Sequence, residues 1–438
     1  MQELKGPILA RHSHVASHSS SEHILNPHSF PVALTPIPLH GAGSFPLSLM
    51  ATLSIQPRAR IFHGHVWVYA TEIKGRFGEP KPGDVVQLQD ARGKPMGSAI
   101  YNPQSQISAR LFSYRRQDLD LDFFIRRIER ALKVRTDAGM DTSLCRVVWS
   151  ESDGLPGVVV DRYGDYLVLQ TLTLAMAMRQ DLIIEALVKI FAPKGIVQRN
   201  EGGVRKAEGM EQVKGGVYGE VPEPFVMRYQ GSAFHVDLLE GQKTGLYLDQ
   251  LDNYQHAAKL AKGRRVLDCF SNQGGFAQAC ALAGASEVTA VDISESATAL
   301  AQKNAAISGA NVQFIAANCF DFLKKQESEG ALYDLIILDP PSFTKTKANV
   351  KDAMRGYKEI HLRALKMLQP GGIMATFSCS HHVSTGEFHA SIEDAAVDAR
   401  KTLRRVTVYT QRPDHPILAT IPETEYLTGY AYEVVAAW

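Results

Sequence analysis

One segment in the second half of the chain reads Val266-Leu267-Asp268-Cys269-Phe270-Ser271-Asn272-Gln273-Gly274-Gly275-Phe276. Its apolar start predicts a buried strand, its glycine pair a tight turn, and the residues from about Gly275 a helix. A strand that passes through such a turn into a helix lets backbone amides approach a ligand at the carboxyl edge of a sheet. The spacing is not the G-x-G-x-x-G of dinucleotide-binding folds, and Asp268 stands where a pyrophosphate would pass. The segment therefore disfavours NAD and suits a ligand with a cationic amino group.

Strands and helices alternate through the rest of the chain. After the first strand we expect strands at 287–292, 312–315, 335–338 and 372–378, and helices near 296–308 and 354–368. This alternation predicts a parallel, doubly wound α/β sheet, in which the carboxyl ends of the strands meet at one edge.

Polar residues follow these strands in an order that suits an adenosine-containing ligand. The second strand ends in Asp292, whose carboxylate can accept both hydroxyls of a ribose, and Asn318 and Cys319 follow the third strand, near the expected adenine edge. Together with Asp268, this set resembles the class I S-adenosylmethionine-dependent methyltransferases, which have a Rossmann-like fold, over residues 231–438. The resemblance implies S-adenosylmethionine as cofactor, with contacts from Thr244, Asp268, Phe270, Gly274, Gly275, Phe276, Asp292, Ile293, Asn318, Cys319 and Asp339.

The fourth strand runs into the loop Asp339-Pro340-Pro341-Ser342-Phe343. Two prolines stiffen this loop, which presents a carboxylate, carbonyls and an aromatic face to a planar ligand. A flipped nucleic-acid base fits such a loop, with its ring against Pro341 and Phe343. The alternative is structural, since a Pro-Pro pair also ends a buried strand.

The fifth strand closes with Ser378-Cys379-Ser380, beside Asp339 at the same edge. Carbon C5 of cytosine is a poor nucleophile until a thiolate adds to C6, so a cysteine here suits methylation of C5, with Asp339 as its catalytic partner. A buried strand cysteine is the alternative. We expect the other four cysteines to pack: Cys269 and Cys319 next to the cofactor, Cys280 on an apolar helix face and Cys145 at the start of a strand.

The composition indicates a protein with large hydrophobic cores. The chain has 438 residues, of which 45% are hydrophobic and 21% charged, so we expect two or three domains. No apolar run is long enough to cross a bilayer, and we predict no membrane partner. The five cysteines form no C-x-x-C pair, so the sequence predicts a reducing, cytoplasmic location and no metal site.

Three regions are expected before the parallel sheet. Residues 1–50 are rich in His, Ser and Pro without any period, which predicts a disordered extension. Residues 51–116 predict a small β domain, and residues 117–230 an α+β linking domain. The expected strands of the β domain are 65–69, 83–90, 97–101 and 107–112, and the linking domain should have helices at 123–132 and 181–190 and strands at 145–149, 155–161, 166–171 and 195–199.

A net charge of +1 conceals two basic stretches, residues 51–115 and 345–366, in which Lys and Arg outnumber Asp and Glu. For either stretch, a solvated face is as good an explanation as phosphate binding.

Several motifs along the chain together resemble one family, the bacterial large-subunit ribosomal RNA cytosine-C5 methyltransferases with an N-terminal PUA domain. In the N-terminal part they are 64–69 and 97–103, in the linking part 153–161 and 199–201, and in the sheet domain 242–250, 339–343, 378–380 and 413–416. The resemblance implies an RNA-binding PUA domain, then the linking domain, then the methyltransferase domain.

The same resemblance implies a mechanism and partners. Cys379 is the nucleophile, Asp339 contacts the cytosine, and Lys243 lies at the substrate, although a surface role for Lys243 is equally plausible. The partner is large-subunit ribosomal RNA or an assembly intermediate that contains it, and a homodimer is possible.

The chain departs from the family pattern at three positions. Leu251 stands where an arginine usually follows Asp249-Gln250, Asn318 stands where an acid is common, and Ser342 stands where other RNA cytosine-C5 enzymes have a second cysteine. We expect the side-chain carbonyl of Asn318 to bond the adenine amino group.

Two other functions stay open. An amino-methyltransferase would hold an exocyclic amine at Asp339-Pro340-Pro341-Ser342-Phe343 and would use Cys379 only for packing. A non-catalytic RNA-binding assembly factor would have a vestigial cofactor site.

Overall fold

The computed structural model describes residues 50–344, 346–380 and 382–436. The expected disordered extension, residues 1–50, lies outside this range except for its last residue. No helix among the described residues is both long and apolar enough to span a membrane.

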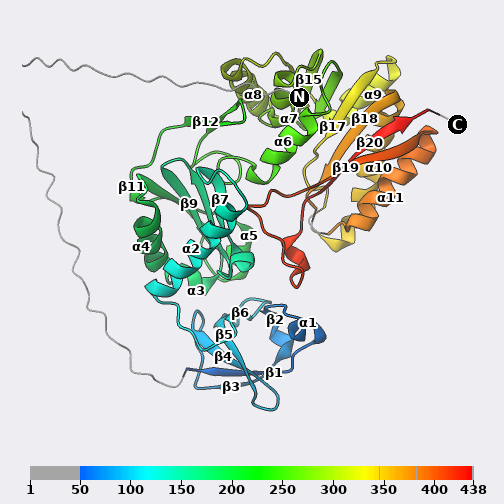
Figure 1. The fold of residues 1–438 in the computed structure, drawn as a ribbon. Coiled ribbons are helices and arrows are strands. Elements are labelled where there is room, and N and C mark those ends of the chain that lie inside the picture. The colour runs from blue at the N-terminus through cyan, green and yellow to red at the C-terminus, as the bar shows by residue number, and fades with distance from the viewer. Residues whose placement is uncertain (1–49, 345, 381, 437–438) are drawn as a thin grey trace, which may run out of the picture. The chain divides into compact units, whose positions relative to one another are not determined.

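The first domain is a small β domain (Figure 1). Its described residues form a six-stranded sheet in the order β2-β6-β5-β4-β1-β3. The elements are β1 Thr52–Ile55, α1 Ala59–Phe62, β2 Trp67–Val68, β3 Ile73–Phe77, β4 Val85–Asp90, β5 Pro95–Tyr101 and β6 Ala109–Ser113. The four expected strands are confirmed as β2, β4, β5 and β6. The sequence analysis missed β1, which has only four residues, and β3, whose central glycine weakens the strand pattern.

The second domain is the expected α+β unit. Its described residues form a five-stranded sheet in the order β11-β10-β9-β8-β7. The elements are α2 Leu121–Asp137, β7 Leu144–Trp149, β8 Val158–Tyr163, β9 Tyr166–Thr171, α3 Leu174–Ala177, α4 Gln180–Phe191, β10 Gly195–Asn200, α5 Gly203–Ala207 and β11 Val213–Gly219. Apolar side chains of α2 and α4 cover this sheet, which buries Phe124, Ile128 and Leu187 completely. The sequence did not predict strand β11, because the pair Gly215-Gly216 interrupts its strand pattern.

A hairpin connects the second and third domains. Strands β12 Phe225–Tyr229 and β13 Ser232–Val236 pair antiparallel with each other. The expected domain boundary after residue 230 falls in the turn of this hairpin. Because β13 packs against helix α8 of the third domain, the hairpin belongs with that domain.

The third domain contains the doubly wound sheet. In the described residues up to 436, seven strands lie in the order β16-β15-β14-β17-β18-β20-β19. The elements are α6 Leu251–Ala258, β14 Arg265–Cys269, α7 Gly275–Leu282, β15 Glu287–Asp292, α8 Glu295–Ser308, β16 Gln313–Ala316, α9 Cys319–Ser328, β17 Tyr333–Leu338, α10 Val350–Lys366, β18 Leu368–Ser378, α11 Thr385–Ala399, β19 Thr402–Thr410 and β20 Thr428–Val435. Strands β14 to β18 are parallel, and all five match the expected strands.

Helices cover both faces of this sheet. Alternate residues of β17 point to opposite sides: Leu335 and Ile337 pack with α6 and α7, whereas Ile336 and Leu338 pack with α9, α10 and α11. Two layers of helices around a mainly parallel sheet leave its carboxyl edge for function.

The last two strands were not expected. Strand β20 pairs antiparallel with both β18 and β19. Between β19 and β20, residues 411–427 leave the sheet and contact the second domain. The backbone oxygen of Pro416, for example, accepts a hydrogen bond from Ser152 at 2.7 Å.

Candidate active site

Asp268 lies at the carboxyl end of β14 and is fully buried. Its Oδ2 accepts a hydrogen bond from the backbone N–H of Ala277 at 3.0 Å, whereas its Oδ1 has no partner among the described residues. Burial raises the pKa of Asp268 well above its usual value, and the charges of Asp339 and Asp292 add to that. A buried carboxylate oxygen without a donor suits a cationic ligand group, as the sequence predicted.

Asp292 organises the turn that follows β14. Its Oδ2 accepts from the backbone N–H of Asn272, and its Oδ1 from that of Ser294, both at 2.9 Å. Phe270 and Asn272 have φ angles of 64° and 48°, so the turn has a tight, left-handed backbone. Each carboxylate oxygen has two lone pairs, so Asp292 can still accept hydroxyl groups.

The glycine pair is required by the packing around the turn. A Cβ atom on Gly274 would lie 3.0 Å from the Phe314 ring, and one on Gly275 would lie 2.4 Å from the Tyr254 ring. The next residue, Phe276, is buried with its ring 5.0 Å from that of Phe377. The structure thus gives the two glycines a steric reason and places the Phe276 side chain in the core, and the cofactor contacts expected of the three residues stay predictions.

The residues expected near adenine divide into two groups. Ile293 is 69% exposed beside Asp292 and offers an apolar surface. The Asn318 side-chain oxygen, in contrast, accepts from the backbone N–H groups of Phe320 and Asp321 and caps α9. The Asn318 oxygen therefore caps the helix, and its bond to an adenine amino group stays a prediction.

Cys319 also has an internal role. Its sulfur accepts a hydrogen bond from the backbone N–H of Phe270 at 3.2 Å and thereby holds the turn after β14. Cys145, Cys269 and Cys280 are buried like Cys319, as expected. All five cysteines lie in described parts of the chain, and Cys379 is the one that is not buried.

Cys379 and Asp339 follow neighbouring parallel strands. Strands β17 and β18 pair with Leu338 opposite Thr376, so the loops that carry the two side chains start side by side. A hydrogen bond of 2.9 Å between the hydroxyls of Ser342 and Ser380 joins these loops.

The electrostatics of the two groups are coupled. Burial and the charge of Asp249 raise the pKa of Asp339 to about 7, although Gln250 donates a hydrogen bond to its Oδ2 at 3.1 Å. Burial and the charge of Asp339 raise the pKa of Cys379 to about 11, against the opposing charge of Lys243. Perturbed carboxyl and thiol groups at the carboxyl edge of such a sheet are typical of a catalytic site.

The loop that begins at Asp339 ends in an aromatic residue with aromatic neighbours. The Phe343 ring lies 5.8 Å from that of Phe320 and 4.7 Å from that of Tyr357, centroid to centroid. Pro341 is exposed. The proline is thus available to a planar ligand, and Phe343 is held by its aromatic contacts.

Residues 242–250 lie against this edge and bring groups that the sequence analysis missed. Gln250 contacts Asp339 directly, and Asp249 acts on the pKa of both Asp339 and Cys379. Tyr247 lies beside them, with Lys243 Nζ 5.6 Å from the centroid of its ring. In the sequence, the signal for these two residues is an acid and an amide, Asp249 and Gln250, directly before a helix.

Thr244 does not border the ligand edge with its hydroxyl. It is buried and donates a hydrogen bond to Asp161 at 2.6 Å, and it lies 3.0 Å from the Tyr163 hydroxyl. Both partners belong to the second domain. The Thr244 side chain thus anchors the loop, and its contact with the cofactor stays a prediction.

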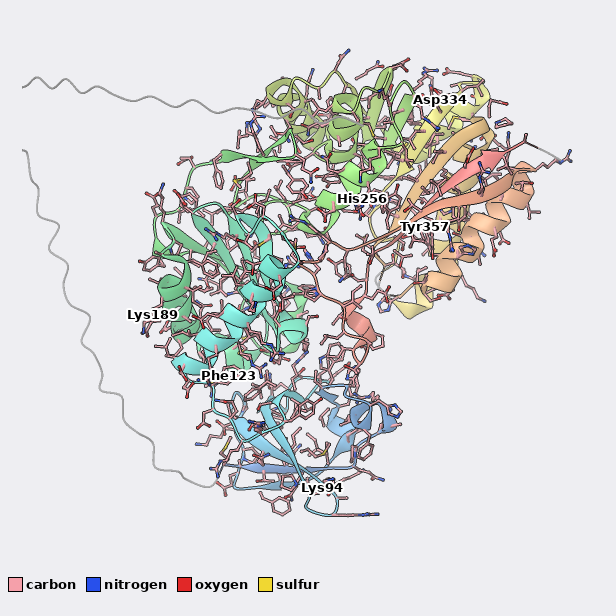
Figure 2. The ribbon with its side chains drawn as sticks, viewed as in Figure 1. Lys94, Phe123, Lys189, His256, Asp334 and Tyr357 are labelled. Carbon is pink, nitrogen blue, oxygen red and sulfur yellow. The ribbon has the colours of Figure 1, made fainter. Side chains whose placement is uncertain are left out.

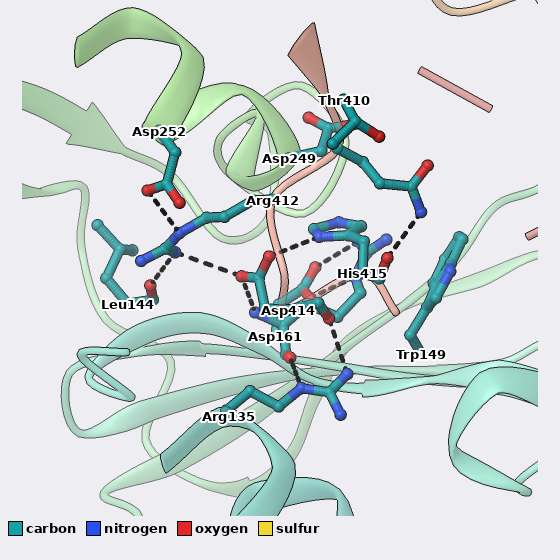
Figure 3. A network of polar contacts seen from close by, with 12 residues as sticks. Arg135, Leu144, Trp149, Asp161, Asp249, Asp252, Thr410, Arg412, Asp414 and His415 are labelled. Carbon is teal, nitrogen blue, oxygen red and sulfur yellow. Dashed lines mark hydrogen bonds and ion pairs between the residues drawn. The ribbon is translucent and has the colours of Figure 1, made fainter. Parts of the chain in front are cut away.

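The segment 411–427 holds residues 242–250 from the other side. Asp249 accepts from the backbone N–H of Arg412 at 3.0 Å through its backbone oxygen and from the Tyr426 hydroxyl at 2.7 Å through its carboxylate. Figure 3 shows how Arg412 and Asp414 continue into the second domain, where Arg135 donates to the Asp414 backbone oxygen at 2.7 Å. This buried polar network couples the second domain to the loop beside Asp339.

Comparisons with known proteins identify the first and third domains. Residues 211–421 match the family model of S-adenosylmethionine-dependent methyltransferases, and residues 53–114 match that of the PUA-like domain. The chain is 38% identical over 378 residues to ribosomal RNA large subunit methyltransferase I of Erwinia tasmaniensis, covering 85% of this chain and 96% of that protein. It is 39% identical over 373 residues to the protein of the same name in Aeromonas hydrophila, covering 83% and 94%.

Solved structures show the same fold. A methyltransferase crystallised with SAH superposes with a TM-score of 0.75 at 21% identity, covering 87% of this chain and 100% of the other. A Streptococcus mutans protein described as a SAM-dependent methyltransferase gives a TM-score of 0.74 at 21% identity, with the same coverage. A PUA-like domain, a linking domain and a class I methyltransferase domain are thus the architecture of the chain.

Proposed function

The chain belongs to the ribosomal RNA large subunit methyltransferase I family, and on this premise we propose that it forms 5-methylcytidine in large-subunit (23S) ribosomal RNA. It is an S-adenosylmethionine-dependent enzyme. The observation that carries the choice of atom is the position of Cys379, the one cysteine that is not buried, beside Asp339 at the ends of β18 and β17.

A thiol at this place suits carbon methylation. The Cys379 thiolate attacks C6 of the cytosine, a C6–S bond forms, and the electron pair of the C5–C6 double bond becomes available at C5. After C5 is methylated, loss of the C5 proton restores the double bond and expels the thiolate. Methylation of an exocyclic amine would need no such nucleophile.

Asp339 supports the attack through its raised pKa. At about 7, this pKa leaves a substantial fraction of the carboxyl group protonated near neutral pH. A protonated Asp339 can donate a hydrogen bond to N3 of the cytosine and stabilise the charge that develops as the thiolate adds to C6. Gln250, which donates to the other side of this carboxyl group, would hold its orientation.

The cofactor residues fit S-adenosylmethionine in part. Asp268 offers an unpartnered buried oxygen to an amino group, Asp292 retains lone pairs for ribose hydroxyls, and Ile293 offers an exposed apolar side chain. When bound, S-adenosylmethionine supplies an electrophilic methyl group on a sulfonium centre.

Several parts of the chain provide the proposed contacts with the RNA. We assign the base to the exposed Pro341 and to Phe343, and a nearby phosphate to the exposed Lys243. Phosphate contacts from the basic residues of the PUA-like domain would hold the remainder of the RNA. The proposed substrate is either the free RNA or an assembly intermediate, and the proposed location of the enzyme is the cytoplasm.

A homodimer is supported by one feature of the sheet. In the described residues β19 is an edge strand of nine residues, with Val408 54% exposed and Val406 42% exposed. An open edge of this length can pair with the same strand of a second copy.

The test is methyl transfer from labelled S-adenosylmethionine to unmodified large-subunit ribosomal RNA, followed by nucleoside analysis. We expect 5-methylcytidine from the native enzyme, none from Cys379→Ala, and a near-native amount from the control Cys280→Ala, whose thiol is buried in the core. Parallel reactions with naked RNA and with immature subunits identify the substrate. Another methylated nucleoside, or an active Cys379→Ala variant, would support the amino-methyltransferase alternative.

A further inference from the structure

Tyr357 is a fully buried residue of α10, in the layer of helices that covers the sheet beneath the site (Figure 2). Its ring packs 4.7 Å from that of Phe343 and 5.1 Å from that of Phe388, centroid to centroid. These contacts fix the ring and leave its hydroxyl at the ends of the strands. Burial also raises the pKa of Tyr357, so the phenol keeps its proton at neutral pH.

The phenol hydroxyl contacts the residues on both sides of Cys379. It lies 2.9 Å from the Ser378 hydroxyl and 3.2 Å from the Ser380 hydroxyl. Ser380 in turn lies 2.9 Å from the Ser342 hydroxyl, which donates to the backbone oxygen of Thr344 at 2.7 Å.

The bond from Ser342 to the Thr344 backbone oxygen determines the direction of all the others, because each hydroxyl carries one proton. Since Ser342 donates to a carbonyl, it must accept from Ser380. Ser380 has then used its proton and must accept from Tyr357. Tyr357 therefore accepts from Ser378, whose oxygen accepts from the backbone N–H of Ser380 at 3.4 Å. The four hydroxyls form one chain of donors with a single direction.

This chain connects the two loops of the site. Ser378 and Ser380 flank Cys379, and Ser342 lies in the loop of Asp339. Tyr357 is the middle member, so removal of its hydroxyl leaves Ser378 without an acceptor and Ser380 without a donor. Both serines are buried, and water cannot readily replace the lost partner.

We propose that Tyr357 is a positioning residue for the thiol step: through Ser378 and Ser380 its hydroxyl fixes the Cys379 loop, and through Ser342 it holds that loop in register with Asp339. Tyr357 does not touch the substrate. This inference rests on the proposed thiol chemistry, because an enzyme that methylates an amine would not need Cys379 in a fixed place.

The test compares Tyr357→Phe with Tyr333→Phe. Tyr333 is also a buried tyrosine of the third domain whose hydroxyl has one side-chain partner, Gln326 at 2.8 Å, at the opposite end of β17. The readout is the rate of covalent adduct formation with RNA that contains 5-fluorocytidine, whose fluorine cannot leave as the C5 proton does. We expect Tyr357→Phe to slow adduct formation by about 10-fold to 100-fold, because small misplacements of reacting atoms have effects of this order. Affinity for S-adenosylmethionine should stay the same, and Tyr333→Phe should form the adduct at the native rate.

A double-mutant cycle shows whether Tyr357 acts through its serine partner. If it does, Tyr357→Phe combined with Ser380→Ala slows adduct formation no more than the slower single variant. Adduct formation by Tyr357→Phe at the native rate, or a fully additive double variant, would overturn the inference while leaving the proposed function intact. Failure of the native enzyme to form any adduct, while it still methylates RNA, would overturn the proposed function itself.

Discussion

Replacement of Asp339 by Asn should make the free enzyme more stable and less active, with a stability gain that depends on pH. The pKa of Asp339 is about 7 in the folded protein and 3.8 for an ordinary aspartate. Between these values the unfolded chain has released the proton and the folded chain retains it, so the stability of the native enzyme falls as pH rises through 7. Asn carries no charge at any of these pH values and can still accept the hydrogen bond from Gln250.

The size of the effect follows from the pKa difference. A shift from 3.8 to about 7 corresponds to a ceiling of about 4 kcal/mol at about 1.4 kcal/mol per unit. Solvent screens the partly buried carboxylate, so we expect about 1–2 kcal/mol of the gain to appear between about pH 5 and pH 8. In a domain of this size, the Tm difference between the variant and the native enzyme should be larger at about pH 8 than at about pH 5 by roughly 2–6 °C. The same change should lower kcat by about 100-fold or more, since Asn cannot supply the carboxyl proton.

Thermal unfolding of the native enzyme and Asp339→Asn at the two pH values measures this directly. The control is Asp352→Asn, at an exposed position of α10, which should change stability by less than about 0.5 kcal/mol at both pH values. An equal Tm difference for Asp339→Asn at low and high pH would refute the argument. The native Asp339 is charged only at the higher pH, so removal of a buried charge can raise the Tm only there.

Three further predictions follow from packing and electrostatics. Arg135→Met should lower stability by about 3–5 kcal/mol, measured by thermal unfolding, because it leaves the buried Asp153 without its ion pair of 2.6 Å. Gly275→Ala should lower stability by about 1–3 kcal/mol, since its Cβ would meet the Tyr254 ring, and Tyr254→Leu in the same chain should restore part of the loss. Alkylation of Cys379 by iodoacetamide should be slow at neutral pH and accelerate up to a pKa of about 11, as mass spectrometry of the modified peptide would show; a plateau near pH 8 would contradict the raised pKa.

The sequence was sufficient where the side chain follows directly from a strand end. Asp268, Asp292, Asp339 and Cys379 each close a strand of the expected parallel sheet, and parallel strands bring their carboxyl ends to one edge. Local hydrophobic patterns therefore predicted both the fold and the main acidic and thiol groups.

Side-chain roles that depend on tertiary contacts could not be predicted from the sequence. The Asn318 oxygen caps its own helix, and the Thr244 hydroxyl reaches Asp161, which is distant in sequence. The apolar pattern of α10 indicates that Tyr357 faces the core, but not that its hydroxyl meets two serines of another strand. A hydrogen-bond partner far along the chain leaves no periodic signal in the sequence.

The charges around Cys379 keep its thiol protonated at neutral pH in the protein without ligands. The charge of Asp339 raises the pKa of Asp268, and the charges of Asp339 and Asp249 both raise the pKa of Cys379. Only Lys243 among the acting charges lowers the pKa of this thiol, and Lys243 is exposed, where water screens it. A cationic ligand enclosed beside Asp268 would lower the pKa of the Cys379 thiol. We therefore expect the Cys379 thiol to ionise more readily with the cationic cofactor bound than in the free enzyme.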